Sequence, residues 1–226
     1  MNVSLLFRTD DSVAIGSGHA MRCLALAQEW QRRGGLAIFS AAETTPSFLQ
    51  RLAGDDIASL RIDAAPGSLA DAEQTISLAR ANNAVWIVAD GYRLGPVWQR
   101  AIKAAGLRLL VLDDHGFCDF FCADLLLNQN ALPPDRDYAA RAPGARQLLG
   151  TRYVLLRREF AVWSSWQRET PALARKILVT LGGADPDNVT SKVIQALAQF
   201  ADVEAVVVVG GANPHLESLQ TLAAGR

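Results

Sequence analysis

The residues best placed to do chemistry begin with His19, which follows Gly16-Ser17-Gly18 and opens the helix-like segment 20–33. An apolar run over residues 3–7 precedes this turn, so the imidazole falls between a predicted strand and a predicted helix. Ligands of open α/β sheets bind outside the carboxyl ends of the strands, where a helix N-terminus offers unpaired N–H groups. A neutral imidazole at such a point can accept a proton from water, so His19 is a candidate general base.

This glycine-rich turn is also open to other interpretations. It is a distant relative of the dinucleotide fingerprint, but the third glycine is missing and Arg22 stands where a small residue is needed, so NAD binding is not predicted. In the alternative to catalysis, Gly16 and Gly18 supply unusual backbone angles and His19 caps or packs against the helix.

Polar motifs follow four of the apolar runs that we predict to be strands. They are Arg8-Thr9-Asp10, Asp90-Gly91-Tyr92, Asp113-Asp114-His115 and Asn128-Gln129-Asn130. Asp and Asn after a strand are often simple turn formers or helix caps. Because the carboxyl ends of parallel strands lie along one edge of a sheet, the four motifs together favour a common site that includes His19.

The elements that position these residues alternate between strand-like and helix-like patterns. Strands are predicted over 3–7, 36–40, 57–62, 85–89, 107–112 and 125–127, and helices over 20–33, 46–52, 69–81 and 96–105. The strands are apolar at consecutive positions, as expected when helices cover both faces of a sheet. The alternation predicts an α/β fold with a doubly wound parallel sheet in an N-terminal domain, residues 1–160.

A second β-turn-α unit is predicted after a linker at residues 161–172. It spans residues 173–226, with strands over 176–181 and 203–210 and a helix over 189–200. Between them, Gly182 and Gly183 allow backbone N–H groups to approach an anion, and Asp187 or Asn188 is expected to cap the helix. Two strands are few for an independent domain, so we expect either a longer chain or association of this unit with the first domain or another subunit.

Composition restricts the partners. The 226 residues are 50% hydrophobic and 20% charged, with a net charge of −1 and a pI near 6.3. No basic field or motif predicts nucleic-acid binding, and no targeting or membrane-spanning segment is evident, so we expect a cytoplasmic location. Cys23 is expected in the core, and Cys118, Cys122 and His115 form an incomplete zinc set, so no metal and no cofactor are predicted.

The order and spacing of these motifs resemble the nucleotide-sugar hydrolases of pseudaminic acid biosynthesis and their spore-coat polysaccharide relatives. The resemblance covers nearly the whole chain. It is carried by residues 8–10 and 15–27, Asp90-Gly91-Tyr92, Leu112-Asp113-Asp114, residues 127–130, Leu149-Gly150-Thr151-Arg152-Tyr153 and residues 181–185. Gly91 stands where the family leads us to expect a histidine, and the family also leads us to expect a longer C-terminal domain than residues 173–226.

The resemblance implies a fold similar to the B-type glycosyltransferases, with two doubly wound domains. It also implies hydrolysis of UDP-2,4-diacetamido-2,4,6-trideoxy-β-L-altropyranose, in which water attacks the anomeric carbon with inversion, UDP leaves, and His19 matches the general base. A glycosyltransferase with a nucleotide-sugar donor and a non-catalytic nucleotide-sugar-binding fragment are the alternatives.

These considerations give two sets of candidate binding residues beside the catalytic His19. The sugar is expected to contact Arg8, Asp10, Gly16, Gly18, Arg22, Tyr92, Asp113, Asp114, Asn128 and Asn130. The uridine diphosphate is expected to contact Gly182, Gly183, Asp185 and Asn188. Asp10, Asp113, Asp114 and Asn130 are also candidates to orient His19.

Overall fold

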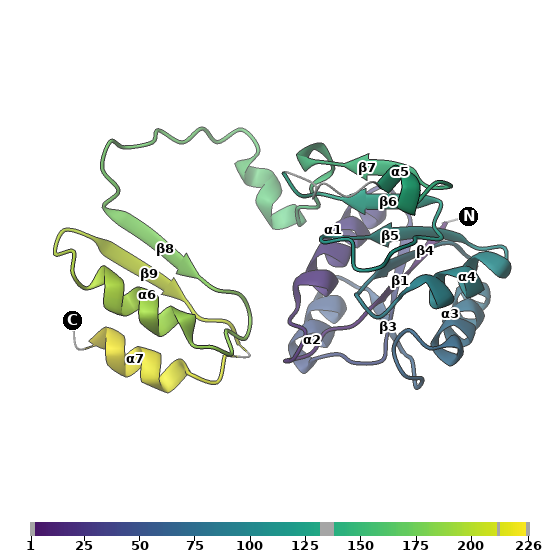
Figure 1. Cartoon of the computed structure of the whole chain (residues 1–226), viewed down its shortest axis with the longest axis horizontal. Helices are drawn as coiled ribbons and strands as arrows, with labels where there is room; N and C mark the ends of the chain where they lie inside the picture. Colours follow the sequence, from purple (N-terminus) through teal and green to yellow (C-terminus); the bar gives the residue numbers. More distant parts are fainter. Residues whose placement is uncertain (1–2, 132–137, 212, 225–226) are drawn as a thin grey trace. The chain divides into compact units, whose positions relative to one another are not determined.

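The computed structural model describes residues 3–131, 138–211 and 213–224 (Figure 1). The chain divides into two compact units, one formed by Met1–Ser12 with Ser17–Ser164 and the other by Ser165–Arg226 with Val13–Gly16. The boundary after Ser164 falls inside residues 161–172, the predicted linker. Each unit is described by itself below.

The first unit is built on a parallel sheet of seven strands in the order β3-β2-β1-β4-β5-β6-β7 (Figure 1). Its strands are β1 (Ser4–Thr9), β2 (Leu36–Ala41), β3 (Ala58–Arg61), β4 (Ala84–Asp90), β5 (Arg108–Leu112), β6 (Leu125–Asn128) and β7 (Arg146–Leu149). Its helices are α1 (Gly18–Arg32), α2 (Pro46–Gly54), α3 (Leu69–Ala81), α4 (Pro96–Ala104) and α5 (Tyr138–Arg141), with 3-10 turns at Thr151–Tyr153 and Arg158–Trp163. The order reverses between β1 and β4, as in a doubly wound sheet.

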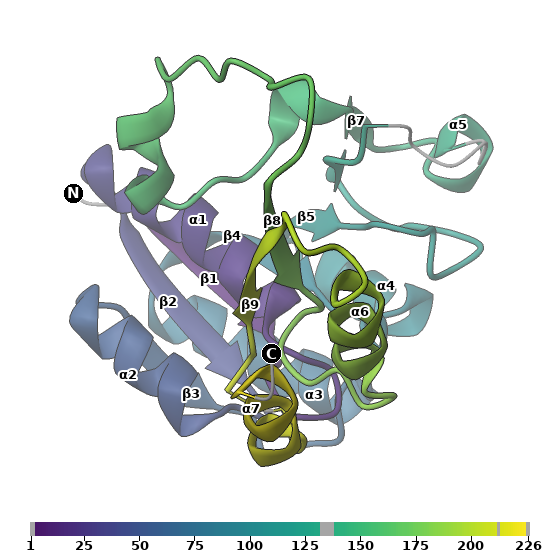
Figure 2. The same ribbon diagram turned by 90° about the vertical axis from the view of Figure 1, so that its left-hand side faces the viewer.

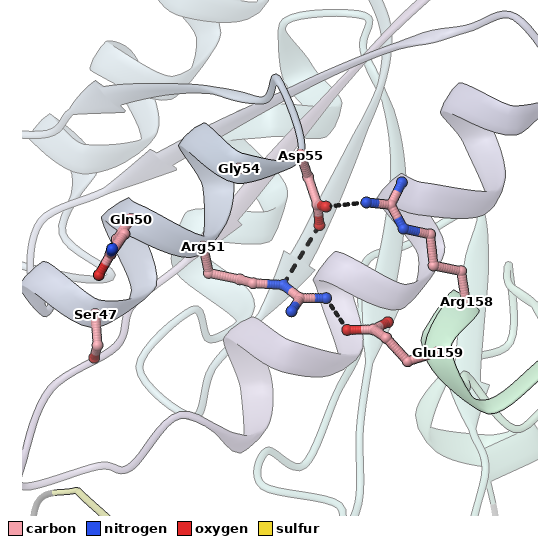
Figure 3. Close-up of a pocket in the computed structure, with 7 residues that line it drawn as sticks. All are labelled: Ser47, Gln50, Arg51, Gly54, Asp55, Arg158 and Glu159. Atoms are coloured by element: carbon pink, nitrogen blue, oxygen red, sulfur yellow. Dashed lines mark hydrogen bonds and ion pairs between the residues drawn. The ribbon is translucent and has the colours of Figure 1, made fainter.

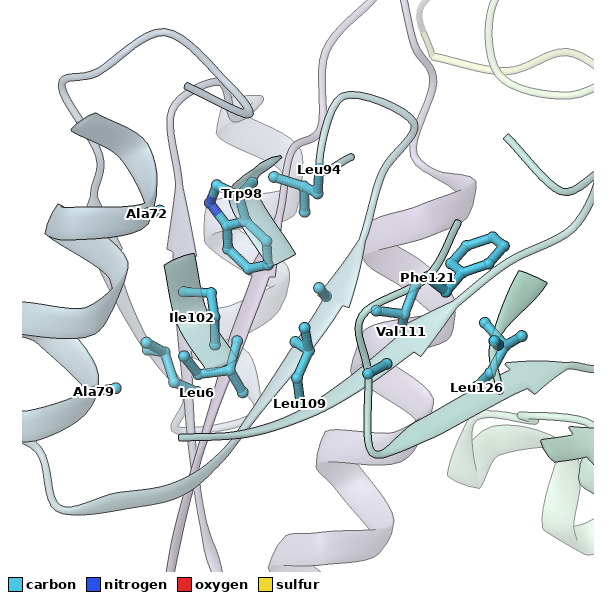
Figure 4. Packing of buried hydrophobic residues seen from close by; sticks show 14 of the residues in the cluster. Leu6, Ala72, Ala79, Leu94, Trp98, Ile102, Leu109, Val111, Phe121 and Leu126 are labelled. Carbon is cyan, nitrogen blue, oxygen red and sulfur yellow. The ribbon is translucent and has the colours of Figure 1, made fainter. Parts of the chain in front are cut away.

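Successive residues of the central strand β1 pack into two different cores. Leu5 and Phe7 join the core that includes Cys23 and Leu24 of α1, whereas Leu6 joins the core that includes Trp98 of α4 (Figure 4). Side chains alternate between the two faces of a strand, so an uninterrupted apolar run requires helices on both sides. The predicted α/β class and the core position of Cys23 are therefore confirmed.

The sheet has one strand more than the sequence pattern predicted. The edge strand β7 has the sequence Arg-Gln-Leu-Leu and pairs with β6 from Leu125↔Arg146 to Asn128↔Leu149. Its four residues are half-buried or exposed, and the run is too short and too polar at its start to resemble the buried strands. β7 is a strand because it pairs with β6, and such pairing is not visible in the periodicity of the sequence.

The turn before α3 and the loop after β4 approach each other closely at Gly67. Its φ of +79° lies in the left-handed region, and a Cβ built on it would lie 1.9 Å from the carbonyl oxygen of Arg93. Such a distance is far inside van der Waals contact, so both the backbone angle and the available space require glycine here.

The last segment of the first unit is held on α1 and α2 by charged side chains. Arg51 pairs with Glu159 and Arg158 pairs with Asp55, around a hollow of about 500 Å³ (Figure 3). Gln28, in the second half of α1, donates to Asp55 at 2.8 Å and accepts from the backbone N–H of Arg158 at 3.0 Å. The opposite charges pair within the hollow, which indicates anchoring of the segment rather than ligand binding.

The second unit contains the parallel strands β8 (Lys176–Thr180) and β9 (Glu204–Val208), which lie side by side (Figure 2). Helices α6 (Val189–Leu197) and α7 (Leu216–Ala224) follow the two strands. Val179, Ile194 and Leu219 are its buried apolar residues. Among the helices described in either unit, none has the length and apolar character that crossing a bilayer requires.

Candidate functional site

His19 lies in the first turn of α1, and its imidazole contacts a carboxylate at the end of strand β4. Its Nδ1 lies 2.6 Å from Oδ1 of Asp90, the last residue of β4. Strand order explains the contact, because β4 pairs directly with β1, whose chain continues into α1. The His19 side chain is 12% exposed and that of Asp90 is fully buried, so the imidazole lies between the protein interior and solvent.

The bond to Asp90 decides which ring nitrogen of neutral His19 carries the proton. A carboxylate only accepts hydrogen bonds and a guanidinium only donates them. Nδ1 has both kinds of neighbour, Asp90 at 2.6 Å and Nη2 of Arg22 at 3.4 Å. The short, charge-assisted contact requires a proton on Nδ1, so Nε2 is left with its lone pair and can act as a base.

Arg22 binds the same aspartate from one turn further along α1. Its Nη2 donates to Oδ1 of Asp90 at 2.8 Å, its Nε donates to Oδ2, and its Nη1 donates to Asp114. Burial disfavours the charged forms, but the hydrogen bonds and opposite charges outweigh it. The pKa of Arg22 is therefore raised, and the pKa of Asp90 is lowered by Arg22 and His19. Asp90 remains ionised beside His19 at neutral pH.

Asp114 is fixed by the motif that follows the neighbouring strand β6. The side-chain amides of Asn128 and Asn130 both donate to its backbone carbonyl, at 3.1 and 3.0 Å. Asn128 is itself buried and also donates to the Tyr138 hydroxyl at 2.9 Å. The two asparagines thus hold the loop of Asp114, and the predicted contact of the buried Asn128 with the sugar remains a prediction.

Tyr92 forms an aromatic wall beside His19. The two rings meet edge to face, with centroids 4.7 Å apart and an interplanar angle of 89°. On its other sides Tyr92 approaches His115 at 6.5 Å and Phe117 at 5.9 Å between ring centroids. Tyr92 is 49% exposed, and partial burial together with the negative charge of Asp114 raises the pKa of its hydroxyl. It therefore presents a neutral hydroxyl and a ring face to solvent.

Asp113 has hydrogen-bond partners inside the protein, and its predicted contact with the sugar remains a prediction. Its side chain is buried and accepts from the backbone N–H groups of Gly116 and Phe117 and from the Tyr138 hydroxyl. Burial and this hydrogen bond raise the pKa of Tyr138 to about 12. Asp113 shapes the loop after β5, and no described contact joins it to His19.

Arg8 and Asp10 form a second charged group, and their predicted contacts with the sugar remain predictions. Arg8 is fully buried; its Nε and Nη2 donate to Asp71 at 2.9 and 2.8 Å, and its Nη1 donates to Asp10 at 2.7 Å. Asp10 also accepts from the backbone N–H groups of Ala42 and Glu43, at 2.8 and 3.2 Å. These bonds tie the ends of β1 and β2 to α3 and leave Arg8 inside the protein.

The two glycines before His19 differ in their backbone. Gly16 has a φ of +73°, in the region that favours glycine. Gly18 begins α1, and among the described residues no atom lies within 4 Å of a Cβ built on it. The backbone argument for glycine therefore applies to Gly16 and not to Gly18.

In the second unit, the turn after β8 contains the predicted diphosphate residues. Gly182 has a φ of +81°, and the backbone of Gly183 lies so close to Gly210 that a Cβ at position 210 would be 2.3 Å from its carbonyl oxygen. Gly182 and Gly183 thus belong to a tight junction between the loops after β8 and β9.

The end of α6 is capped by a different residue from those predicted. Asp185 accepts from the backbone N–H groups of Val189 and Thr190, both at 2.9 Å, whereas Asn188 has a left-handed backbone and makes no side-chain cap. The hydrogen bonds from Thr190 lower the pKa of Asp185. Asp185 thus caps the helix in place of Asp187 or Asn188, which corrects the expected cap, whereas the contacts of Asp185 and Asn188 with uridine diphosphate remain predictions.

Asp90 is the important residue that the sequence interpretation did not include in the site. The motif Asp90-Gly91-Tyr92 is evident in the sequence, but the candidates that the sequence offers to orient His19 are Asp10, Asp113, Asp114 and Asn130. The signal that would have identified it is strand order: in a doubly wound sheet the first and fourth strands are adjacent, so the end of the fourth lies beside the first helix.

Comparison with known proteins confirms the resemblance inferred from the motifs. The chain matches no family model. It is 25% identical over 226 residues to the UDP-2,4-diacetamido-2,4,6-trideoxy-beta-L-altropyranose hydrolase of Campylobacter jejuni, covering 98% of this chain and 74% of that protein. It is 22% identical over 223 residues to the uncharacterized protein MJ1062 of Methanocaldococcus jannaschii, covering 95% of this chain and 44% of that one.

Solved structures with the same fold include glycosyltransferases. Acinetobacter baumannii MurG superposes with a TM-score of 0.61 at 16% identity, covering 99% of this chain and 64% of its own. Anabaena Alr3699/HepE, in complex with UDP-glucose, superposes with a TM-score of 0.60 at 15% identity, covering 99% and 65%. The chain spans about two thirds of the length of these structures, and the likeness confirms the predicted B-type glycosyltransferase-like fold.

Proposed function

We propose that this protein acts on a nucleotide sugar and that it hydrolyses the bond between the anomeric carbon and UDP. The observation that carries the proposal is the 2.6 Å contact between Nδ1 of His19 and Asp90, which leaves Nε2 of a partly exposed imidazole available as a base. The Campylobacter jejuni relative, named as a hydrolase of a UDP-linked diacetamido sugar, supports this substrate class.

In the proposed reaction, Nε2 of His19 takes a proton from water as the water oxygen bonds to the anomeric carbon. The bond from that carbon to the diphosphate oxygen breaks, and its electron pair leaves with UDP, with inversion at carbon. The imidazolium formed at His19 is stabilised by the ionised Asp90. A positioned base of this kind contributes about 10²- to 10⁴-fold to the rate.

We assign the sugar to the rim of this site and the nucleotide to the second unit. Tyr92 offers a ring face and a hydroxyl, and the Asp114 side chain, 19% exposed, can accept from a hydroxyl or acetamido N–H. Asn130 and the turn at Gly16 and Gly18 belong to the same proposal. The backbone at Gly182 and Gly183 is proposed to bind the diphosphate, and the free sugar to supply pseudaminic acid synthesis in the cytoplasm.

The second candidate function is glycosyl transfer from the same donor class. It is favoured by the fold, because MurG and the glycosyltransferase SnogD share it with TM-scores of 0.61 and 0.57. A transferase requires an acceptor hydroxyl in place of water, and only the dependence of the rate on an acceptor separates the two reactions.

The test is UDP release from UDP-2,4-diacetamido-2,4,6-trideoxy-β-L-altropyranose, followed by a coupled assay with and without candidate acceptors. We expect acceptor-independent release, a loss of at least about 100-fold in His19→Ala, and near-parental release in His115→Ala. His115 is the matched control because it is an exposed histidine and no described contact joins it to His19 or Asp90. Release only with an acceptor would favour the transferase. Nucleotide-sugar binding without release would leave a binding protein, and comparable rates in both histidine variants would remove His19 from the role.

A further inference from the structure

Each of the three nitrogen atoms of the Arg22 guanidinium donates to a carboxylate of the protein. Nε and Nη2 bind the two oxygens of Asp90, and Nη1 binds Asp114. Only 10% of its side chain is exposed, compared with 19% for Asp114. A residue that recognised substrate would be expected to direct its donors outwards, whereas Arg22 donates to Asp90 at the end of β4 and to Asp114 in the loop after β5.

Both ends of this link are fixed by further bonds. Asp90 ends a central strand and accepts from His19 as well as from Arg22. Asp114 is held through its carbonyl by Asn128 and Asn130. Arg22 therefore connects the carboxylate behind His19 to a loop that two asparagines immobilise, and this defines the plane in which the Asp90 carboxylate lies.

We propose that Arg22 is a positioning residue, which holds the Asp90 carboxylate in the orientation that accepts the Nδ1 proton of His19, and that it does not bind the substrate. The expected effect of Arg22 on the reaction rate rests on the proposed function. The hydrogen bonds among Arg22, Asp90 and His19 do not depend on a substrate. It replaces the expectation from the sequence that Arg22 contacts the sugar.

The chemistry of the side chain explains why arginine is needed. A planar guanidinium can bind both oxygens of one carboxylate and still direct a third nitrogen to another, whereas a lysine ammonium is a single point charge on a flexible stem. Lysine would keep the charge beside Asp90 and lose the two-pronged contact. Arg22→Lys thus separates charge from orientation.

The kinetic experiment compares Arg22→Lys with the parent chain in the UDP-release assay. We expect kcat to fall about 10- to 100-fold, the cost of a misplaced catalytic group, with KM within about twofold because no substrate contact is removed. An increase in KM with little change in kcat would overturn the proposal and make Arg22 a substrate contact.

A second experiment follows the hydrogen bond between His19 and Asp90 in the absence of substrate. In proton NMR of the full chain, the Nδ1 proton of His19 should give a protected low-field resonance, assigned by its loss in His19→Ala. We expect this resonance to broaden or exchange at least about tenfold faster in Arg22→Lys, as its acceptor loses a fixed orientation. An unchanged resonance in a folded Arg22→Lys chain would overturn the proposal.

A matched variant covers the case in which Arg22→Lys does not fold, as judged by circular dichroism. Asp114→Asn weakens the far end of the link without altering His19, Asp90 or Arg22, and should accelerate exchange of the same proton to a smaller extent. Unchanged exchange in Asp114→Asn would then count against the proposal. If the parent chain released no UDP, the proposed function would fail, while the NMR comparison would still decide the role of Arg22.

Discussion

Two arginines in the first unit are each bound by two aspartates, yet their surroundings differ. Arg8 and Asp71 are completely buried, and Asp71 also accepts from the N–H of Gly67 and from the indole of Trp98, at 2.8 and 3.2 Å. Around Arg22, the corresponding aspartate accepts from the imidazole of His19, which reaches solvent.

The difference shows what separates a structural ion pair from a candidate site. In both places burial favours neutral forms, and hydrogen bonds with opposite charges overcome it, so the pKa of each buried aspartate is lowered. At Asp71 every described partner is an internal donor whose proton stays in place. At Asp90 one partner is an imidazole that reaches solvent and has a second ring nitrogen, which the bond to Asp90 does not use.

The largest effect is expected from Asp90→Asn, in the group formed by His19, Arg22 and Asp90, where it should lower the rate of UDP release. An amide in place of the carboxylate no longer favours the Nδ1–H form of His19, and in a comparable Asp–His pair this change costs about 10⁴-fold in rate. UDP release under saturating substrate measures it, with unfolding followed in parallel. A variant that retained more than about a tenth of parental kcat would contradict the role of Asp90.

The matched change in the buried Arg8–Asp71 ion pair, Asp71→Asn, should instead lower the free energy of unfolding. Arg8 would keep Asp10 as a charged partner but lose the buried carboxylate that binds two of its nitrogens, and breaking a buried ion pair costs about 3–5 kcal/mol of unfolding free energy. Denaturant titration measures the loss, and activity per folded molecule should remain within about twofold of the parent. Equal stability of the two chains would mean that Arg8 finds another partner or solvent.

A smaller effect should appear when the pH dependence of stability is compared between the parent and Asp71→Asn. Because the folded-state pKa of Asp71 is lowered, its contribution is complete above the ordinary pKa of an aspartate, about 3.9, and disappears as the pH falls through the folded value. The stability difference between the two chains should therefore be constant near neutral pH and narrow below about pH 4. If the difference in unfolding free energy between the two chains grew as the pH fell, the pKa of Asp71 would be raised, not lowered, in the folded protein.

The smallest effect is expected at a carboxylate that binds no arginine. Asp185 accepts from Val189, Thr190 and the Thr190 hydroxyl at the start of α6. Asp185→Ala should lower the thermal midpoint of the chain by less than Asp71→Asn does, and Asp185→Ser should restore part of the loss by capping the helix again. A decrease as large as that of Asp71→Asn would show that charge pairing is not what distinguishes the two aspartates.

Sequence reasoning reached the fold and part of the site for a physical reason. Alternating apolar runs and the polar residues after them are local signals, and they located His19, Tyr92 and Asp114 at one edge of the sheet. Which carboxylate meets His19 depends on the adjacency of β1 and β4, a long-range property. The internal roles of Arg8 and Asp113 depend on Asp71 and Tyr138, which lie 63 and 25 residues away along the chain.

Gly67 contacts both the buried Arg8–Asp71 ion pair and the loop that carries Tyr92. Its N–H donates to Asp71, and its α-carbon lies against the carbonyl of Arg93, one residue after Tyr92. A methyl group at position 67 would push the structural ion pair and the aromatic wall apart together. A substitution at Gly67 is thus expected to disturb the Arg8–Asp71 ion pair and the loop that carries Tyr92 at the same time, so tolerance to substitution should be lower there than at Asp71 or Asp90.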